Sequence, residues 1–407
     1  MISVPLQTKK HLSHLDGIRG LSAIYVVIYH AILQYYPSVR DLWSYPLSTL
    51  QKILFFPLKH GHYAVDVFIV LSGFSLMLSV IKNNHIIKGG YKAFFIRRIK
   101  RIIPPYYFTV LLSLLLIHFA IGKKTNTQWD VSIPVNYEDI VLHIFLIHDF
   151  FLSSFAHINH ALWSIAVEFR IYFLFPTIIL LWKWKGAFIA FLGSIFCSII
   201  IFGGLIYCKQ FNVNINVEHS GVNPYIILFT TGMLSAEFSF SESIVSKKVR
   251  EAYKAFPSTT LLIFCSIILI CFVYTKLLLQ SSNSANSTIA CNGILDILIG
   301  LTFSGILFMF SIVTHVDKQT LFFVKALSWR PLVFVGTFSF SLYLIHPLLL
   351  QLVSQYLIGP VIVSKATQSY TLILIGPVIS IGAAYIFYLA FERPFIQPAI
   401  KTSELIK

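Results

Sequence analysis

Long apolar runs follow one another along most of this chain, separated by short polar stretches. Most of them approach the roughly 20 residues that an α-helix needs to cross a bilayer. They predict about ten membrane-spanning helices, near residues 15–36, 64–82, 103–121, 162–182, 187–207, 223–238, 257–279, 293–314, 332–354 and 371–391. We therefore expect an all-α polytopic membrane protein that forms a single transmembrane domain over residues 1–407.

A shorter apolar run, VLHIFLIHDFFLS, lies at residues 140–152, and His143, His148 and Asp149 interrupt it. At this length it predicts a short re-entrant or interfacial segment and not a span. An eleventh span here would also reverse the side of the membrane on which every later loop lies, and the distribution of basic residues opposes that.

The basic residues predict which side of each span faces the cytoplasm. The chain has 31 Lys and Arg against 16 Asp and Glu, a net charge of +15. In a soluble protein this excess would suggest a nucleic acid partner. Here most basic residues lie in short loops on one side of the predicted spans, which the positive-inside rule assigns to the cytoplasm. We expect an integral membrane protein with both termini in the cytoplasm, contacts with membrane lipids and no nucleic acid partner.

The first span, LDGIRGLSAIYVVIYHAILQYY, carries Arg19 near its start and His30 near its end. Eleven positions on an α-helix correspond to about 1100° of rotation and about 16 Å of rise, so both residues lie on one face. Ionisable residues inside a span usually face a protein interior or an aqueous cavity, which favours a polar pathway along this face. The alternative is that Arg19 snorkels to the interface while His30 bonds a neighbouring helix.

A basic run, RRIKR, precedes IIPPYY at the start of the third predicted span. Arg98 and Arg101 are three positions apart and share a face if this segment is helical, and two guanidiniums so placed can hold a phosphate. The alternative is an ordinary positive-inside cluster that contacts lipid headgroups.

His30 lies at a depth where two carboxylates, Asp66 and Glu168, are also expected. A histidine beside a carboxylate can act as a general base, because the carboxylate fixes its tautomer and stabilises the imidazolium. Either carboxylate could be the partner. Asp66 could instead bond the first-turn amides of its helix, and Glu168 could pair with Arg170.

Four further polar or aromatic residues fall at the same level, and we expect them to bind the substrate: Trp163, Ser164, Tyr343 and His346. His346 could equally make a structural hydrogen bond at the kink of Pro347. The five cysteines show neither metal-ligand nor disulfide spacing, so no metal is expected.

Six segments in order resemble the acyltransferase-3 family of integral membrane acyltransferases, which modify bacterial surface glycans and some small molecules. They are LDGIRGLSAIYVVIYHA with Arg19 and His30, AVDVFIVLSGF, RRIKRIIPPYY with Arg98 and Arg101, LWSIAVEFRIYFLFP, FSFSLYLIHPL and FERPF. The resemblance covers nearly the whole chain. It implies that His30 is essential for acyl transfer, that Arg19, Arg98 and Arg101 contact an acyl-CoA donor, and that the protein lies in a bacterial cytoplasmic (inner) membrane.

The resemblance further implies an O-acetyltransferase that uses acetyl-CoA and a glycan or lipid-linked sugar acceptor. Some members carry a fused extracytoplasmic SGNH-type domain. Because this chain ends shortly after its last predicted span, we expect none here, which leaves open whether a separate extracytoplasmic partner protein takes part.

The residues and the resemblance agree on one hypothesis. Acyl-CoA binds the arginines from the cytoplasm, its thioester reaches His30 through one continuous tunnel, and His30 takes the proton of an acceptor hydroxyl. A covalent acyl-His30 intermediate is a variant. The alternatives are a transporter or flippase for a polar or lipid-linked substrate, or a protein in which the polar residues only hold helices together.

Overall fold

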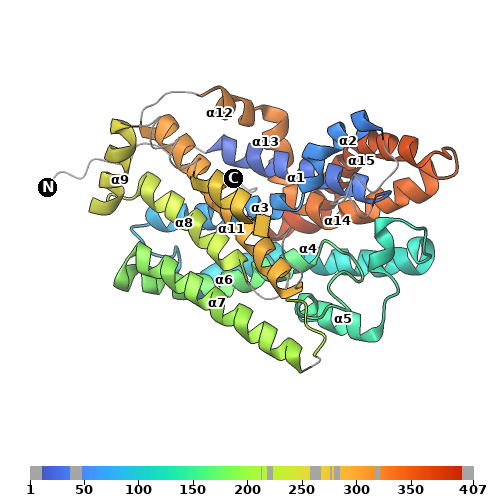
Figure 1. Ribbon diagram of the computed structural model, residues 1–407, viewed down its shortest axis with the longest axis horizontal. Helices are drawn as coiled ribbons and strands as arrows, with labels where there is room; N and C mark the ends of the chain where they lie inside the picture. Colours follow the sequence, from blue (N-terminus) through green and yellow to red (C-terminus); the bar gives the residue numbers. More distant parts are fainter. Residues whose placement is uncertain are drawn as a thin grey trace, which may run out of the picture.

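The computed structural model describes residues 12–36, 48–211, 213–217, 223–256, 267–275, 277–278, 285–316 and 321–396. Within these ranges the chain is a bundle of α-helices (Figure 1), and its β-structure is limited to one isolated bridge between Phe151 and Ile215. The predicted all-α polytopic fold class is confirmed.

Eight helical stretches in the described ranges are long and apolar enough to cross a membrane. They contain α1 (Ser13–Leu33), α3 (Tyr63–Ile81) with the preceding α2 (Thr49–Phe55), α4 (Gly90–Leu116), α6 (Trp163–Lys185), α7 (Ala187–Gln210), α11 (Ala285–Ser311), α14 (Ser339–Leu352) and α15 (Lys365–Phe387). Shorter helices are α5 (Tyr137–Ile144), α8 (Tyr225–Phe240), α9 (Ile244–Ala255), α12 (Phe322–Leu327), α13 (Arg330–Thr337) and α16 (Arg393–Ile396).

Two of the ten predicted spans have no counterpart among the eight long helices. The run at 223–238 corresponds to α8, which has 16 residues. The run at 257–279 lies partly outside the described residues. Of this run the structure describes residues 267–275 and 277–278, which are helical. The number of spans therefore stays a prediction, as does the side on which the termini lie.

Two predicted boundaries differ from the structure for local reasons, and the segment 140–152 is short and broken, as predicted. The third helix begins at Gly90 and not near 103, because the basic run is helical and continues through Pro104 and Pro105. The run 332–354 is divided at Phe338, where α13 ends and α14 begins. In the segment 140–152, α5 ends at Ile144 and a short 3₁₀ turn follows at His148–Phe150, so it does not form a long helix.

Glycines bring two pairs of helices into backbone contact. A Cβ atom at Gly73 of α3 would lie 2.0 Å from the Phe229 carbonyl oxygen of α8, and one at Gly232 would lie 2.0 Å from the Val70 carbonyl oxygen. Likewise, a Cβ at Gly336 of α13 would lie 1.9 Å from the carbonyl oxygen of Asp16 in α1. Such small residues let helices approach closely in a membrane. These contacts set the positions of α1 and α3, which carry polar residues of the candidate site.

Two connecting segments, one around α9 and one around α5, lie towards different ends of the long axis of the molecule. In Figure 1 the basic helix α9 lies at the left end, and α5, within the long segment between α4 and α6, lies towards the right. The helices α1, α3, α4, α6 and α14 pass through the middle, where most of the large buried core lies.

Candidate active site

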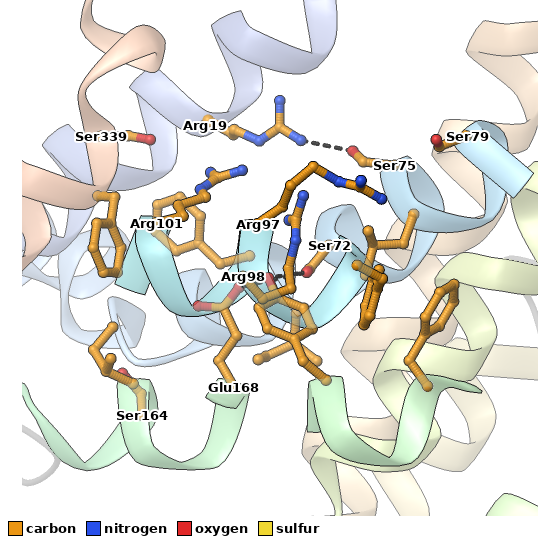
Figure 2. A pocket seen from close by; sticks show the side chains of 18 of the residues that line it. Arg19, Ser72, Ser75, Ser79, Arg97, Arg98, Arg101, Ser164, Glu168 and Ser339 are labelled. Carbon is orange, nitrogen blue, oxygen red and sulfur yellow. Dashed lines mark hydrogen bonds between the residues drawn. The ribbon is translucent and has the colours of Figure 1, made fainter. Parts of the chain in front are cut away.

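A cavity of about 240 Å³ lies where α1, α3, α4, α6 and α14 meet. Its lining is strongly cationic, and Figure 2 shows four arginines directed towards the same space. The described lining residues include a single carboxylate, Glu168, and five basic side chains, Arg19, Lys88, Arg97, Arg98 and Arg101. Because buried charge needs compensation, this excess of guanidinium groups favours a bound anion.

Arg19 is held across the cavity by two hydrogen bonds. It donates to Asp16, one turn earlier on α1, at 2.6 Å. It also donates to the hydroxyl of Ser75 on α3 at 2.6 Å (Figure 2). The ion pair with Asp16 follows from their spacing of three positions on one helix. Arg19 therefore links the two helices that the glycine contacts hold in place.

Arg98 and Arg101 line the same cavity from α4. The Arg98 guanidinium lies 5.8 Å from the ring centroid of Phe94 and 5.6 Å from that of Tyr172, and its buried Nε has no hydrogen-bond partner among the described residues. Arg101 interacts electrostatically with Glu168 and Glu392, among other groups. A guanidinium with an unused buried donor is suited to bind a ligand oxygen.

Glu168 belongs to this arginine-lined cavity. It accepts a hydrogen bond from the Tyr172 hydroxyl and a longer one from Ser72 at 3.4 Å, and Ser72 and Tyr172 are themselves 2.8 Å apart. The alternative partner of Glu168, Arg170, instead bonds Asp149 and donates to the Leu146 carbonyl.

Asp66 lies elsewhere. It is buried in the first turn of α3, its main electrostatic neighbour is Asp296 of α11, and it does not line the cavity. The expected carboxylate partner of His30 therefore needs correction: the structure pairs neither Asp66 nor Glu168 with His30. Asp66 on α3 and Glu168 on α6 each have other neighbours.

Two histidines take the place of that carboxylate. The Nδ1 atom of His30 lies 3.3 Å from Nε2 of His160, and the His30 ring centroid is 5.0 Å from those of both His160 and His346. Sequence reasoning missed His160, which lies in the segment before α6. The signal that could have found it is HINHALWS, which places a histidine three residues before Trp163.

Ser164 and Tyr343, two of the lining residues, are joined by a hydrogen bond. The Ser164 hydroxyl donates to the Tyr343 hydroxyl at 2.7 Å, and both side chains line the cavity. Beyond them, the Tyr343 ring centroid is 5.6 Å from that of His346, which in turn neighbours His30. His30 is not among the described lining residues, so the cavity does not extend to it as the expected continuous tunnel would.

The other expected substrate contacts, Trp163 and His346, lie outside the cavity lining. The Trp163 ring centroid is 5.7 Å from that of Tyr225 on α8. His346 is fully buried, and its Nδ1 donates to the Tyr343 carbonyl oxygen at 2.7 Å, a local contact next to Pro347. This geometry favours the structural alternative for His346.

Sequence reasoning also missed several lining residues. Arg97 was recognised only as part of a basic run, and it donates to the Lys88 carbonyl oxygen at 2.6 Å. Ser72, Ser75 and Ser79 form a stripe of hydroxyls on the face of α3 that lines the cavity, a helical spacing visible in LSGFSLMLS. In the ranges that the structure describes, no group of three or more His, Cys, Asp or Glu residues is placed to hold a metal ion.

The fold and this site define a class: a polytopic α-helical membrane protein with a cationic cavity beside a histidine cluster. A family model described as an acyltransferase domain matches residues 12–391. The chain therefore belongs to the acyltransferase-3 family, and the resemblance drawn from its motifs is confirmed.

Several relatives of the chain are named as acetyltransferases. A "putative O-acetyltransferase" of Staphylococcus aureus is 26% identical over 412 residues, which covers 96% of this chain and 58% of the relative. A "putative peptidoglycan O-acetyltransferase" of Bacillus subtilis is 24% identical, covering 84% and 49%. The peptidoglycan O-acetyltransferase OatA of Listeria monocytogenes is 23% identical, covering 83% and 49%.

The chain thus spans about half the length of these relatives. None of the three carries the name of a transporter. No solved structure matches the chain.

Proposed function

We propose that this protein is a membrane O-acyltransferase that moves an acyl group, in the first instance acetyl, from cytoplasmic acyl-CoA to a hydroxyl of an extracytoplasmic or lipid-linked glycan. The observation that carries the proposal is the cavity itself. It has four arginines in its walls, and at its Tyr343 end it is separated from the His30 cluster by side chains in contact with one another.

The arginines support an acyl-CoA donor because CoA carries its phosphates at the nucleotide end. Guanidiniums bind phosphate oxygens bidentately, and they do so more strongly where water is excluded. Arg98 brings a buried donor with no protein partner among the described residues, and Arg97 and Lys88 extend the positive charge along the same lining. Because Arg19 is already ion-paired with Asp16, it contributes to donor binding mainly through its place in the cavity wall.

The remainder of the lining suits the rest of the donor. The pantetheine arm is uncharged and alternates alkyl groups with two amides. The lining offers apolar side chains such as Phe68 and Ile69 together with the hydroxyls of Ser72 and Ser75. Such a mixed wall can hold the arm in an extended conformation and direct the thioester to Ser164 and Tyr343.

His30 supplies the acid–base chemistry. It accepts the proton of the acceptor hydroxyl while that oxygen attacks the thioester carbonyl carbon. A carbon–oxygen bond forms, the carbon–sulfur bond breaks, and the proton passes from His30 to the departing CoA thiolate. For the thioester to meet His30, the Ser164–Tyr343 hydrogen bond must open.

The names of the relatives support a glycan acceptor, since the Listeria protein is named a peptidoglycan O-acetyltransferase. An extracytoplasmic partner protein that receives or presents the acceptor is part of the proposal. The transporter alternative has no comparable support among these names.

The test uses the purified protein in lipid nanodiscs with acetyl-labelled acetyl-CoA and a peptidoglycan fragment. We expect the wild type to consume the thioester and label the fragment, and His30→Ala to lose about a hundredfold or more in turnover, a typical value for removal of a general base. His118→Ala, at a histidine in the turn that follows α4 whose ring neighbours Phe119, is the matched control and should retain the wild-type rate. A His30→Ala variant with wild-type turnover would overturn the proposal, and movement of an intact substrate into sealed proteoliposomes without thioester cleavage would favour a transporter.

A further inference from the structure

His160 joins His30 to the long segment between α4 and α6. It is 8% exposed, its Nε2 lies 3.3 Å from Nδ1 of His30, and its Nδ1 lies 3.1 Å from the hydroxyl oxygen of Ser132. The Trp129 ring is fully buried, and its centroid lies 6.1 Å from that of the His160 ring in an edge-on arrangement. These contacts form a chain of hydrogen bonds from Ser132 through His160 to His30.

The backbone around His160 is fixed from two sides. The amide side chain of Asn159 donates to the Leu344 carbonyl oxygen of α14 at 3.0 Å, and its oxygen accepts from the Ala161 amide at 3.1 Å. The Ile158 amide donates to the Ser132 carbonyl oxygen at 2.9 Å. His160 is therefore held against α14 and Ser132 independently of its contact with His30.

The hydrogen-bond chain can run in two directions. If Ser132 donates to His160, then His160 donates from Nε2 to Nδ1 of His30, and the proton of His30 sits on Nε2. If His30 donates from Nδ1, then His160 accepts at Nε2 and donates from Nδ1 to the Ser132 oxygen, and His30 Nε2 keeps its lone pair.

Only the second direction leaves His30 able to take a proton at Nε2. It also survives the reaction, because a protonated His30 still carries the Nδ1 proton that His160 accepts. The first direction would then oppose two N–H groups. Burial and the neighbouring His346 lower the pKa of His160 to about 3, so His160 stays a neutral acceptor when His30 is charged.

We propose that His160, anchored by Ser132, is a positioning residue that fixes the ring orientation and the Nδ1-protonated tautomer of His30 during acyl transfer. The proposal rests on the proposed function, since it assigns His160 a role through His30. A neutral imidazole thereby does what a carboxylate does in other base pairs, at a place in the membrane where a negative charge would be costly.

The test compares His160→Ala and His160→Gln with wild type in nanodiscs, measuring kcat, the KM for acetyl-CoA, the pH profile and the melting temperature. We expect His160→Ala to lower kcat about tenfold or more, with the KM within about twofold, and to shift the acidic limb of the profile to lower pH because the imidazolium loses its acceptor. Glutamine retains an amide oxygen that can accept from His30, so His160→Gln should recover part of kcat.

His157→Gln is the matched control. His157 lies three residues away, its ring bonds Asp139, and it does not touch His30, so kcat and the pH profile should stay as in wild type. If His160→Ala keeps the wild-type kcat and pH profile while His30→Ala is inactive, the positioning role is wrong and the proposed function stands. If His160→Ala and His160→Gln lose kcat equally along with their melting temperature, the role is structural and the proposal is overturned. If wild type itself fails to transfer the acetyl group, the proposed function fails first.

Discussion

The cationic residues of the cavity differ in what already neutralises each of them. Arg19 is paired with Asp16, and Arg101 faces Glu168 and Glu392. Arg98 lies near two aromatic rings and interacts with Tyr172 and Glu168, but its buried Nε has no hydrogen-bond partner in the described part of the chain. Since a ligand gains most from donors that no protein group already uses, Arg98 should contribute the most to donor affinity.

Arg98→Ala is therefore expected to raise the KM for acetyl-CoA about tenfold or more, because a hydrogen bond to a charged group contributes roughly 1.5–3 kcal/mol. Its kcat should fall less, since the phosphates lie far from the bond that breaks. Steady-state kinetics of acetyl-CoA hydrolysis measure both values.

Lys100→Ala is the matched control, because Lys100 is exposed on the same helix and does not line the cavity. Its kinetic constants should equal those of wild type. An Arg98→Ala variant with an unchanged KM and a reduced kcat would contradict the assignment of Arg98 to phosphate binding.

At the scale of helices, close crossings position the site. α3 packs against α8 through Gly73 and Gly232, and this places the Ser72 and Ser75 hydroxyls opposite the arginines. In a bilayer, where apolar surface alone does not drive helices together, such backbone contact supplies much of the packing. The geometry of the cavity thus depends on residues that do not line it.

Gly73→Ala should lower the melting temperature of the protein in detergent. The new methyl group would lie 2.0 Å from the Phe229 carbonyl oxygen, so the helices must separate, and overpacking typically costs about 1–3 kcal/mol. Gly203→Ala on α7 is the control, since a Cβ there meets nothing within 4 Å. Equal melting temperatures for the two variants would show that the α3–α8 crossing tolerates a side chain.

The segment between α4 and α6, which carries His160, is held by a buried carboxylate. Burial alone would raise the pKa of Asp139, but hydrogen bonds from Ser154, the Asn136 amide and His157 outweigh it and lower that pKa below 3.8. A lowered carboxyl pKa adds stability that is present above the unfolded value and is lost as the pH falls through the folded value.

We expect Asp139→Asn to melt at a lower temperature than wild type at neutral pH, and the difference to shrink as the pH falls below 3.8. Melting curves at several pH values measure this. Glu138→Gln, at the exposed neighbouring position, should follow the wild-type curve throughout. A difference that stays constant across the acidic range would mean that the Asp139 charge does not stabilise the fold.

At the scale of the whole molecule, the predicted membrane sidedness can be tested on two connecting segments that lie apart along the long axis. The basic helix α9 and the segment around α5 lie towards opposite ends in Figure 1. The positive-inside rule predicts that α9 lies on the cytoplasmic side, and on that prediction the segment that carries His160 is expected on the outer side. An acceptor arriving from outside would then meet the histidine cluster, and acyl-CoA from inside would meet the arginines.

Single cysteines at exposed positions test this arrangement in a background where the native cysteines are replaced by alanine. A membrane-impermeant maleimide should label Lys124→Cys in intact cells and Lys248→Cys only after permeabilisation, since Lys124 precedes α5 and Lys248 lies on α9. The cysteine-free parent should remain unlabelled in both conditions. The reverse labelling pattern would place the arginine-lined cavity towards the outside of the cell, away from cytoplasmic acyl-CoA.

The sequence by itself determined the helical class, the family and the shared cavity face of Arg98 and Arg101. Hydrophobic run length and helical periodicity are local properties, so they can be read without knowing which helices are neighbours. The hydrophobic pattern did not predict the start of α4 at Gly90. The charged residues before Pro104 interrupt the apolar run, although they belong to the same helix.

Only the tertiary structure decided which groups surround His30. The position of each residue along its predicted span placed His30, Asp66 and Glu168 at one depth in the membrane. A shared depth does not specify the rotation of each helix about its axis. That rotation turns Glu168 towards Ser72 and Tyr172, and a segment 130 positions from His30 in sequence brings His160 to its ring. Contacts between residues so far apart depend on the packing of the whole bundle, which no local pattern encodes.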